Sequence, residues 1–406
     1  MAEKLPLANI EDEDKEYLQS TLEIDTDECF DVDETMAYIP FAFARQTFVI
    51  DKRESVAREC GKFTAQLRDE QTRIKTLALS ELNDSGSIVI AAHPGFGKTI
   101  TAISIACELN TKTVIIVNKL VLIEQWKDAI AKFTTGCASQ YVTSRTLSLD
   151  PTASIYIVNA INIRKKPRSF WREIEFMIVD ELHQIVTKNL TKALLLFTPN
   201  YVLGLSATPY RFDEYDRAIA WFFGKRLIGK KLNAAHTATI IKTGFTPTRL
   251  KYTRQGVDWN SVLMEQSEND KRNDIIVNAV LEHPARTWMI LVKRVAHATI
   301  LVEKFNARRV ECTTLLGSAI SFDVNCKILI GTTSKIGVGF DHAAIDALCI
   351  AADVKNYFVQ FLGRCMRRPD CKPIVVDFDD DYGPLKRHLE ERIKDYKKHG
   401  GIVRNV

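Results

Sequence analysis

The sequence predicts an α/β protein with parallel sheets covered by helices on both faces, arranged as two domains. Strand-length runs of Val, Ile and Leu alternate with segments whose apolar residues recur at helical spacing. The alternation stops in an irregular stretch over residues 211–254 and then starts again. At 406 residues, 46% of them hydrophobic, the chain is long enough to build two cores.

Acidic residues dominate the beginning of the chain. Residues 1–34 contain thirteen acidic residues and two lysines, a net charge of −11, whereas the whole chain carries +4. The remaining residues therefore carry +15, which fits a polyanionic partner. We expect residues 1–35 to form a flexible acidic leader, a solvated extension rather than a tail that mimics nucleic acid, with structure starting near Met36.

The composition excludes several classes of protein. No apolar run is long enough to span a bilayer, and the first residues lack the apolar core of a signal peptide, so we expect an intracellular, soluble protein. The nine cysteines include no C-x-x-C pair. Neither a zinc cluster nor a disulfide framework is therefore expected.

The first domain is expected over residues 36–250. An amphipathic helix is predicted over residues 63–82, followed by a buried strand over 87–92 and a helix over 100–109. The next predicted elements, in the order strand, helix, strand, strand, helix and strand, are 113–117, 120–133, 154–158, 176–179, 190–197 and 201–205.

The second domain is expected over residues 251–382, after a hinge near residues 246–256 where Gly, Pro and Thr are frequent. Residues 383–406 should form a basic amphipathic helix, docked on the domain and stopped at Gly400, with a short tail. The predicted elements of the second domain are the helices 258–281, 295–305 and 356–366 and the strands 288–292, 310–316, 327–330, 347–351 and 373–378.

The segment IVIAAHPGFGKT, residues 88–99, combines a buried strand, a turn with two glycines and a helix start. Gly95 and Gly97 allow backbone amides to approach phosphate oxygens closely. Lys98 would reach the β- and γ-phosphates, and the Thr99 hydroxyl would bind Mg²⁺. Because Ala92 replaces the first glycine of the general pattern, the motif alone leaves open an ordinary strand-turn-helix, and also kinases, GTPases and transporters. The second domain contains no such loop.

A second motif, FMIVDELH at residues 176–183, leads from four apolar residues directly into two carboxylates. The end of a buried strand places them at the carboxyl edge of the sheet, beside the phosphate loop. Asp180 would hold Mg²⁺ through water, and Glu181 would orient and deprotonate an attacking water. Together the two motifs predict a hydrolytic site.

With both motifs in order, the chain resembles the superfamily 2 helicases of the Asp-Glu-x-His kind. LGLSATPYR (203–211) is similar to their Ser-Ala-Thr motif, GTTSKIGVGFD (331–341) to their fifth motif and QFLGRCMRR (360–368) to their arginine motif. VIIVNKLVLIEQWK is similar to XPB-like helicases, and AAHTATIIKTGFTP followed by RTWMILVKRV is similar to the compact helicases of poxviruses and iridoviruses. The resemblance implies two tandem RecA-like domains with the nucleotide site in the cleft between them.

The resemblance implies ATP and Mg²⁺ as cofactors. Gln71 would read adenine, and Gln360 would sense the γ-phosphate or water. Arg364 and Arg367 would act as arginine fingers from the second domain, since a guanidinium fork stabilises charge on a transferring phosphoryl group. The other implied nucleotide contacts are Pro94, Gly95, Phe96, Gly97, Lys98, Thr99, Ile100, Gly339 and Asp341.

Coupling and strand binding are implied in the same way. His183, Ser206 and Thr208 would couple the state of the nucleotide to domain closure. A nucleic-acid strand, DNA rather than RNA, would be bound through its backbone without recognition of its sequence. The matching positions are Asn118, Lys119, Gln125, Asn159, Lys293, Arg294, Thr332 and Thr333.

The leading hypothesis is therefore an ATP-dependent helicase or translocase, moving 3′ to 5′ as a monomer. It would work with viral transcription or replication proteins in the host nucleus, the cytoplasm or the virion, and without a membrane partner. Two alternatives stay open. One is a duplex translocase or transcript-release factor that does not separate strands, and the other is a non-hydrolysing nucleic-acid-binding subunit of a transcription complex.

Overall fold

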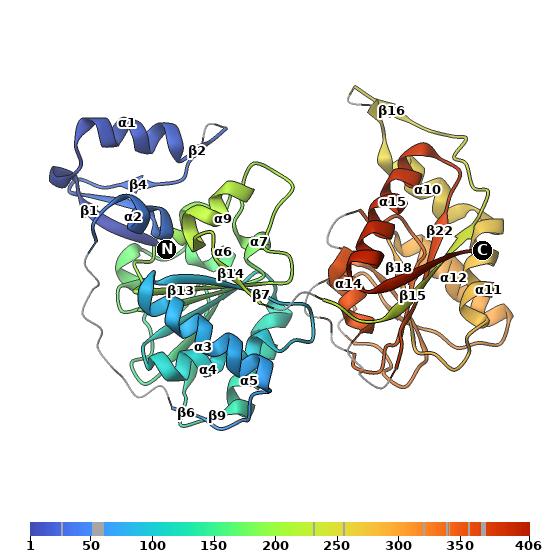
Figure 1. Ribbon diagram of the computed structural model, residues 1–406, viewed down its shortest axis with the longest axis horizontal. Coiled ribbons are helices and arrows are strands. Elements are labelled where there is room, and N and C mark those ends of the chain that lie inside the picture. Colours follow the sequence, from blue (N-terminus) through green and yellow to red (C-terminus); the bar gives the residue numbers. More distant parts are fainter. Residues whose placement is uncertain are drawn as a thin grey trace. The chain divides into compact units, whose positions relative to one another are not determined.

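The computed structural model describes residues 1–25, 27–50, 61–229, 232–254, 256–319, 321–337, 340, 342–355, 358–366 and 371–406. The chain forms two compact units, residues 1–230 and 231–406. Each contains a seven-stranded sheet whose neighbouring strands all pair in parallel, with helices on its two faces (Figure 1). This confirms the predicted fold class.

The first unit alternates strands and helices along its sequence. Its parallel strands are β7 (Ser87–Ala91), β8 (Thr113–Val117), β10 (Ser139–Val142), β11 (Ile155–Asn159), β12 (Phe176–Asp180), β13 (Tyr201–Ser206) and β14 (Leu227–Ile228). Its helices are α3 (Asp69–Asp84), α4 (Lys98–Leu109), α5 (Leu120–Phe133), α6 (Ala160–Ile163), α7 (Leu182–Ile185), α8 (Thr191–Leu194) and α9 (Asp216–Phe223), with a 3-10 turn over Arg168–Trp171. The strand order is β10-β11-β8-β12-β13-β7-β14.

Two predicted helices of this unit are shorter in the structure. The helix predicted over residues 63–82 begins only at Asp69, because β6 (Lys62–Phe63) pairs instead with β9 (Thr134–Thr135) in an antiparallel ribbon. The helix predicted over residues 190–197 is reduced to α8. Strands β10 and β14 and helix α9 were not predicted.

The acidic beginning of the chain is folded onto the first unit, which corrects the expectation that structure starts near Met36. Strands β1 (Ala2–Pro6), β4 (Asp31–Val32) and β5 (Met36–Pro40) form an antiparallel sheet in the order β1-β5-β4. Around it lie a 3-10 turn (Leu7–Asn9), α1 (Asp12–Thr21), the hairpin β2 (Glu23–Ile24) and β3 (Asp27–Glu28), and α2 (Phe41–Thr47).

The physical reason is that a few apolar side chains suffice to dock this acidic segment. Leu18, Leu22 and Ile24 are buried in the core shared with helix α9, while most acidic side chains stay at the surface. Two ionic contacts add to this packing: Lys188 lies 2.7 Å from Asp27, and a guanidinium nitrogen of Arg168 lies 2.7 Å from Asp31. The sequence suggested a leader because charged residues outnumber the apolar ones.

The second unit repeats the architecture. Its sheet contains β15 (His236–Lys242), β18 (Trp288–Val292), β19 (Thr313–Leu315), β20 (Ile328–Thr332), β21 (Ala347–Ile350), β22 (Ile374–Asp379) and β23 (Gly401–Asn405), in the order β19-β20-β18-β21-β22-β15-β23. Its helices are α10 (Trp259–Glu268), α11 (Asp270–Leu281), α12 (Val295–Ala307), α13 (Thr333–Gly337), α14 (Phe358–Cys365) and α15 (Gly383–Lys398), and β16 (Tyr252–Thr253) and β17 (Gly256–Val257) form a hairpin.

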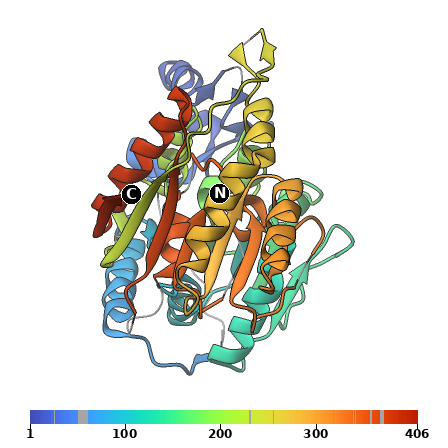
Figure 2. The same ribbon diagram turned by 90° about the vertical axis from the view of Figure 1, so that its right-hand side faces the viewer.

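Alternate residues of the second sheet point to opposite layers of helices, as period-two strands require. Trp288 and Ile290 join a core cluster with residues of α11 and α12, whereas Met289 and Leu291 join a cluster with residues of α14 and α15. Figure 2 faces this unit, with α15 (red) at the side of β23 and α11 and α12 (orange) on the other face of the sheet. Among the described helices, none is long and apolar enough to cross a membrane.

The division between the units lies after residue 230, not after the predicted residue 250. Strand β15 belongs to the second sheet, where it pairs with β22 and β23. This strand was not predicted because residues 236–242, HTATIIK, contain only a short apolar run and lie in an otherwise irregular stretch. The helix predicted over residues 258–281 is two helices, since Asn269 leaves the helical conformation and its side chain caps α11.

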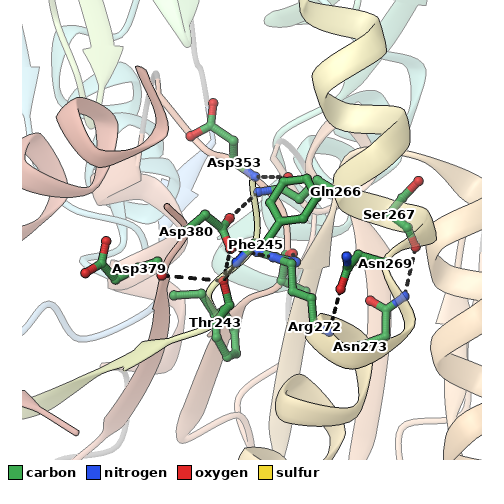
Figure 3. Close-up of polar contacts among 12 residues, drawn as sticks. Thr243, Phe245, Gln266, Ser267, Asn269, Arg272, Asn273, Asp353, Asp379 and Asp380 are labelled. Atoms are coloured by element: carbon green, nitrogen blue, oxygen red, sulfur yellow. Dashed lines mark hydrogen bonds and ion pairs between the residues drawn. The ribbon is translucent and has the colours of Figure 1, made fainter. Parts of the chain in front are cut away.

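A buried polar network holds the carboxyl end of the second sheet together (Figure 3). Asp380, just after β22, accepts hydrogen bonds from Thr243 at 2.6 Å, from Gln266 at 2.7 Å and from Arg272 Nε at 2.8 Å. Arg272 also donates to the carbonyl oxygen of Ala351 at 2.6 Å and is 1% exposed. Since each buried charge is hydrogen-bonded, the network ties α10 and α11 to the ends of β15 and β22.

We expect the substitution Arg272→Met to destabilise the protein by about 3–5 kcal/mol, because it leaves the Asp380 carboxylate buried without its charged partner. The matched control is Arg308→Met, which removes an ion pair between Arg308 and Asp274 that is partly exposed and should cost about 1 kcal/mol or less. Urea unfolding of the full chain, followed by tryptophan fluorescence, measures both. Equal losses in the two variants would contradict the prediction.

Candidate nucleotide and nucleic-acid site

The phosphate loop joins β7 to α4 in the first unit, as predicted. Gly95 and Gly97 adopt positive φ angles of 82° and 95°. A Cβ atom at Gly97 would lie 2.3 Å from Nε2 of Gln71, so only glycine fits there. The Lys98 ammonium donates to the carbonyl oxygen of Ala92 at 2.8 Å, folding the side chain back over the loop. The loop is thus shaped to receive phosphate oxygens with backbone amides and one mobile cation.

Gln71, at the start of α3, lies against this loop. Its Oε1 accepts from the Arg68 amide at 2.9 Å, and its Nε2 donates to the carbonyl oxygen of Phe96 at 2.8 Å. The Arg68 side chain donates to the same oxygen. Gln71 is 4% exposed, so it supports the loop directly. Sequence reasoning missed Arg68, the N-cap of α3, and this role of Gln71 in the first turn of the same helix.

The remaining predicted nucleotide contacts divide into two sets. Pro94 lies in the turn of the loop and Thr99 and Ile100 in the first turn of α4, and all three side chains are partly buried. Gly339 and Asp341, predicted from the fifth motif, lie outside the residues that the structure describes.

Asp180 is the last residue of β12 and pairs in register with Leu205 of β13. Its carboxylate is 8% exposed and accepts a 3.0 Å hydrogen bond from Nε1 of Trp126 on α5. Burial and, to a smaller extent, the neighbouring Glu181 charge raise the pKa of Asp180 to about 6, while Trp126 and Lys98 act in the opposite direction. A carboxylate held in this way favours a bound cation. Trp126 has no signal in the sequence beyond its place on the apolar face of α5.

Glu181 combines backbone strain with a buried oxygen. Its φ is 50°, in the left-handed region that a non-glycine residue rarely adopts. Within the described part of the chain, its Oε2 is buried and makes no hydrogen bond. Both features cost free energy in the folded protein, and such costs are typical of functional residues.

The three predicted coupling residues are brought together behind these carboxylates. His183 Nδ1 lies 2.8 Å from Ser206 Oγ, and the Thr208 amide donates to the same oxygen at 3.0 Å. Burial lowers the pKa of His183 to about 3, so the imidazole is neutral at ordinary pH. Arg211 donates to the carbonyl oxygen of His183. The ends of β12 and β13 are therefore joined by side chains.

Three of the four predicted strand contacts of the first unit lie at the carboxyl ends of two adjacent strands, since Val117 of β8 pairs with Asn159 of β11. Asn118 and Lys119 are partly buried, and Gln125 on α5 is exposed. Asn159 is 6% exposed, and its Oδ1 accepts from the Ile161 amide as the cap of α6. Its side chain thus already has a structural role.

The second unit shows the same arrangement. Val292 pairs with Thr332, so Lys293 and Arg294 follow β18 beside the end of β20. Lys293 is exposed, whereas Thr332 is 7% exposed and shares a 3.2 Å hydrogen bond with Ser334. Thr333 begins α13 and is partly buried. Seven of the eight predicted strand contacts therefore lie at the carboxyl ends of strands or at the start of the helix that follows, whereas Gln125 lies in the second turn of α5.

Gln360 and Arg364 lie one turn apart on α14 and are 3% and 6% exposed. The Arg364 guanidinium donates to the carbonyl oxygen of Gly337 at 2.7 Å and to that of Phe340. It therefore contacts two described residues of the segment predicted as the fifth motif, and the sequence did not predict these contacts. Arg367 lies outside the described residues.

Comparisons with known proteins agree with this site. Residues 64–211 match the family described as type III restriction enzyme, res subunit. Three viral proteins with helicase names are similar in sequence: 161L of Invertebrate iridescent virus 6, 40% identical over 399 residues (91% of this chain, 89% of that protein); 055L of Frog virus 3, 32% identical over 385 residues (91% and 86%); and the ATP-dependent RNA helicase L396 of Acanthamoeba polyphaga mimivirus, 21% identical over 357 residues (83% and 68%).

A solved structure with a similar fold is a single-substitution variant of Dbp5 from S. cerevisiae, bound to RNA and ADP BeF3. Its TM-score is 0.56 at 14% sequence identity, and the match covers 82% of this chain and 89% of that one. At this identity the likeness concerns the fold, which is that of tandem RecA-like domains.

Proposed function

The chain belongs to the family of superfamily 2 helicases found in iridoviruses and other large DNA viruses, and from this membership we propose that it couples ATP hydrolysis to movement along nucleic acid. The observation that carries the proposal is the carboxylate pair at the end of β12. Asp180 is buried with a raised pKa, and Glu181 is strained with a buried oxygen that lacks a hydrogen bond among the described residues. These features cost folding free energy, and a subunit that only binds nucleic acid has no use for them.

The phosphate loop would hold ATP through its backbone amides and the N-terminus of α4. Lys98 would exchange the carbonyl oxygen of Ala92 for the β- and γ-phosphates. Thr99 and Asp180 would hold Mg²⁺, which neutralises phosphate charge when bound. The buried carboxylate of Asp180, already close enough to Lys98 for that charge to lower its pKa, fits this role.

Glu181 would take the proton from the attacking water, because its Oε2 is an acceptor that makes no hydrogen bond to any described residue. Gln360, Arg364 and Arg367 of the second unit would act on the γ-phosphate of the same nucleotide. Arg364 would have to release the carbonyl oxygens of Gly337 and Phe340 to do so. His183, Ser206 and Thr208 would couple the state of the nucleotide to closure of the two domains, and their reopening would advance the strand.

The nucleic acid would be bound through its phosphates at the carboxyl edges of the two sheets, with an affinity that falls steeply with salt. We favour DNA over RNA and movement in the 3′ to 5′ direction, in viral transcription or replication and together with proteins of those processes. The active form would be a monomer in the host nucleus, the cytoplasm or the virion. The name of L396 includes RNA, so RNA belongs in the test.

The test is phosphate release by the full chain with Mg²⁺ and ATP, measured alone and with single-stranded DNA, duplex DNA or RNA. We expect hydrolysis to be stimulated most by DNA. Absence of stimulation by all three nucleic acids would defeat the proposal. Failure to bind ATP in a direct titration would favour a non-hydrolysing subunit instead.

A duplex translocase or transcript-release factor is the alternative within the motors. A strand-displacement assay and a triplex-displacement assay, run with the same protein, separate it from a helicase. Triplex displacement without strand displacement identifies the translocase, whereas strand displacement with a 3′ single-stranded tail identifies the helicase and its direction.

A further inference from the structure

Gln184, the residue after the Asp-Glu-Leu-His motif, connects a residue predicted to bind the strand with the residues predicted to couple hydrolysis to domain closure. Its Oε1 accepts a hydrogen bond from Nδ2 of Asn118, and its Nε2 lies 3.3 Å from Nε2 of His183. His183 in turn contacts Ser206 through Nδ1 at 2.8 Å. The loops after β8, β12 and β13, which are neighbours in the sheet, are therefore joined by one continuous chain of side chains.

The donors and acceptors of this chain have a direction. An amide nitrogen only donates, so Gln184 Nε2 must donate to His183 Nε2. The neutral imidazole then carries its proton on Nδ1 and donates it to Ser206 Oγ, which also accepts from the Thr208 amide. Every bond runs from Asn118 toward Ser206. Rotating the amides of Gln184 and Asn118 together, with the His183 proton on Nε2 and the Ser206 hydroxyl donating to Nδ1, would reverse each bond, so this series of hydrogen bonds has two discrete arrangements.

Each end of the chain lies at a site of the proposed function. Asn118 is partly buried, its Oδ1 is buried and makes no hydrogen bond within the described residues, and it precedes Lys119 at the edge proposed to bind the strand. Next to the Ser206 end, His183 Nδ1 lies 3.6 Å from Oε2 of Glu181, the proposed base, which is not itself a member of the hydrogen-bonded series. Asn118 Oδ1 within the series and Glu181 Oε2 beside it are thus two buried oxygens without a hydrogen bond among the described residues, and each is available to a ligand.

We propose that Gln184 is a positioning residue that couples strand binding to hydrolysis by setting the tautomer and orientation of His183. When a strand phosphate accepts a hydrogen bond from the Asn118 amide, Gln184 loses its donor. The orientation of Gln184 can then change, and the hydrogen bonds of His183 and Ser206 change with it because they depend on that orientation. This inference rests on the proposed function. It adds a defined link between the strand site and the base.

The first test is independent of activity. Nitrogen-15 NMR of the histidine rings, with the His183 signal identified by its loss in His183→Gln, reports the tautomer in the full-length protein. We expect the proton on Nδ1 in the wild type and on Nε2 in Gln184→Glu, since a carboxylate at position 184 accepts but cannot donate. The same tautomer in both proteins would overturn the inference, even if the proposed hydrolysis is correct.

The second test compares the rate of ATP hydrolysis with and without single-stranded DNA. In Gln184→Ala and Gln184→Glu we expect the ratio of stimulated to basal rate to fall by about tenfold, within the range of typical coupling energies, while the dissociation constant for the strand changes less than the ratio does. Combining Asn118→Ala with Gln184→Ala should lower the ratio no further than the larger single effect.

The matched control is Gln140→Ala, which removes another partly buried glutamine of the first unit whose Oε1 accepts from a backbone amide. This control should leave the ratio unchanged. A ratio that is also unchanged in both Gln184 variants, or basal and stimulated rates that fall equally, would mean that Gln184 only fills space. If the wild type shows no stimulation while the tautomer changes as expected, the proposed function fails and the link between Gln184 and His183 stands.

Discussion

The substitution Glu181→Gln is expected to lower the nucleic-acid-stimulated rate of ATP hydrolysis by a factor of about 10²–10⁴, the usual contribution of a general base. Glutamine has nearly the same shape but cannot accept the proton of the attacking water. It also removes the negative charge that helps to raise the pKa of Asp180, so binding of Mg²⁺ and ATP should persist. Steady-state phosphate release and a nucleotide titration measure the two quantities.

The control for this prediction is Glu124→Gln on α5, which removes an exposed carboxylate whose partner is Lys127 three residues later. Its hydrolysis rate should match that of the wild type. If Glu181→Gln keeps more than about a tenth of the stimulated rate, a loss well below the contribution of a general base, another residue must activate the water.

Lys98→Ala should abolish measurable hydrolysis, with a loss of at least about a hundredfold, because it removes the cation expected at the β- and γ-phosphates. ATP affinity should fall with it. The Lys98 side chain is only partly buried and its ammonium donates to the carbonyl oxygen of Ala92, within the phosphate loop itself, so the fold and nucleic-acid binding should remain in this variant. Filter binding of a labelled strand without nucleotide, beside the hydrolysis assay, tests both parts.

Lys132→Ala is the matched control, since Lys132 is an exposed lysine at the end of α5 in the same unit. Loss of strand binding in Lys98→Ala but not in Lys132→Ala would show that Lys98 supports the fold or the strand site rather than the phosphates, contrary to the prediction.

Helices and strands with a clear pattern of apolar residues were predicted almost to the residue. The strands 113–117 and 288–292 and the helix 120–133 have the bounds that the sequence indicates. The two strands are continuous apolar runs, and the helix carries an apolar stripe. In each case the local sequence pattern predicts the same side chains to be buried as the tertiary structure buries. Strand β15, in contrast, is Thr-rich and half-buried, and its place between β22 and β23 depends on residues more than a hundred positions away.

The acidic beginning of the chain shows a different limit. Its charge density suggested an extension, because sequence reasoning weighs average composition. The structure shows that Leu18, Leu22 and Ile24 bury completely or nearly so, while most of the acidic side chains remain at the surface. Docking requires only a few apolar contacts when the surface that receives them is already folded.

The chemistry of the site followed from the sequence because it resides in consecutive residues. The loop around Lys98 and the pair Asp180 and Glu181 are local motifs, whose spacing fixes both the backbone shape and the chemical groups. The partners of these residues are not local. Trp126 contacts Asp180 across 54 positions and Asn118 contacts Gln184 across 66. The sequence by itself thus determined which groups are present at each strand end, and only the tertiary structure decided which of them meet, because the order of strands in a parallel sheet is set by packing between distant segments.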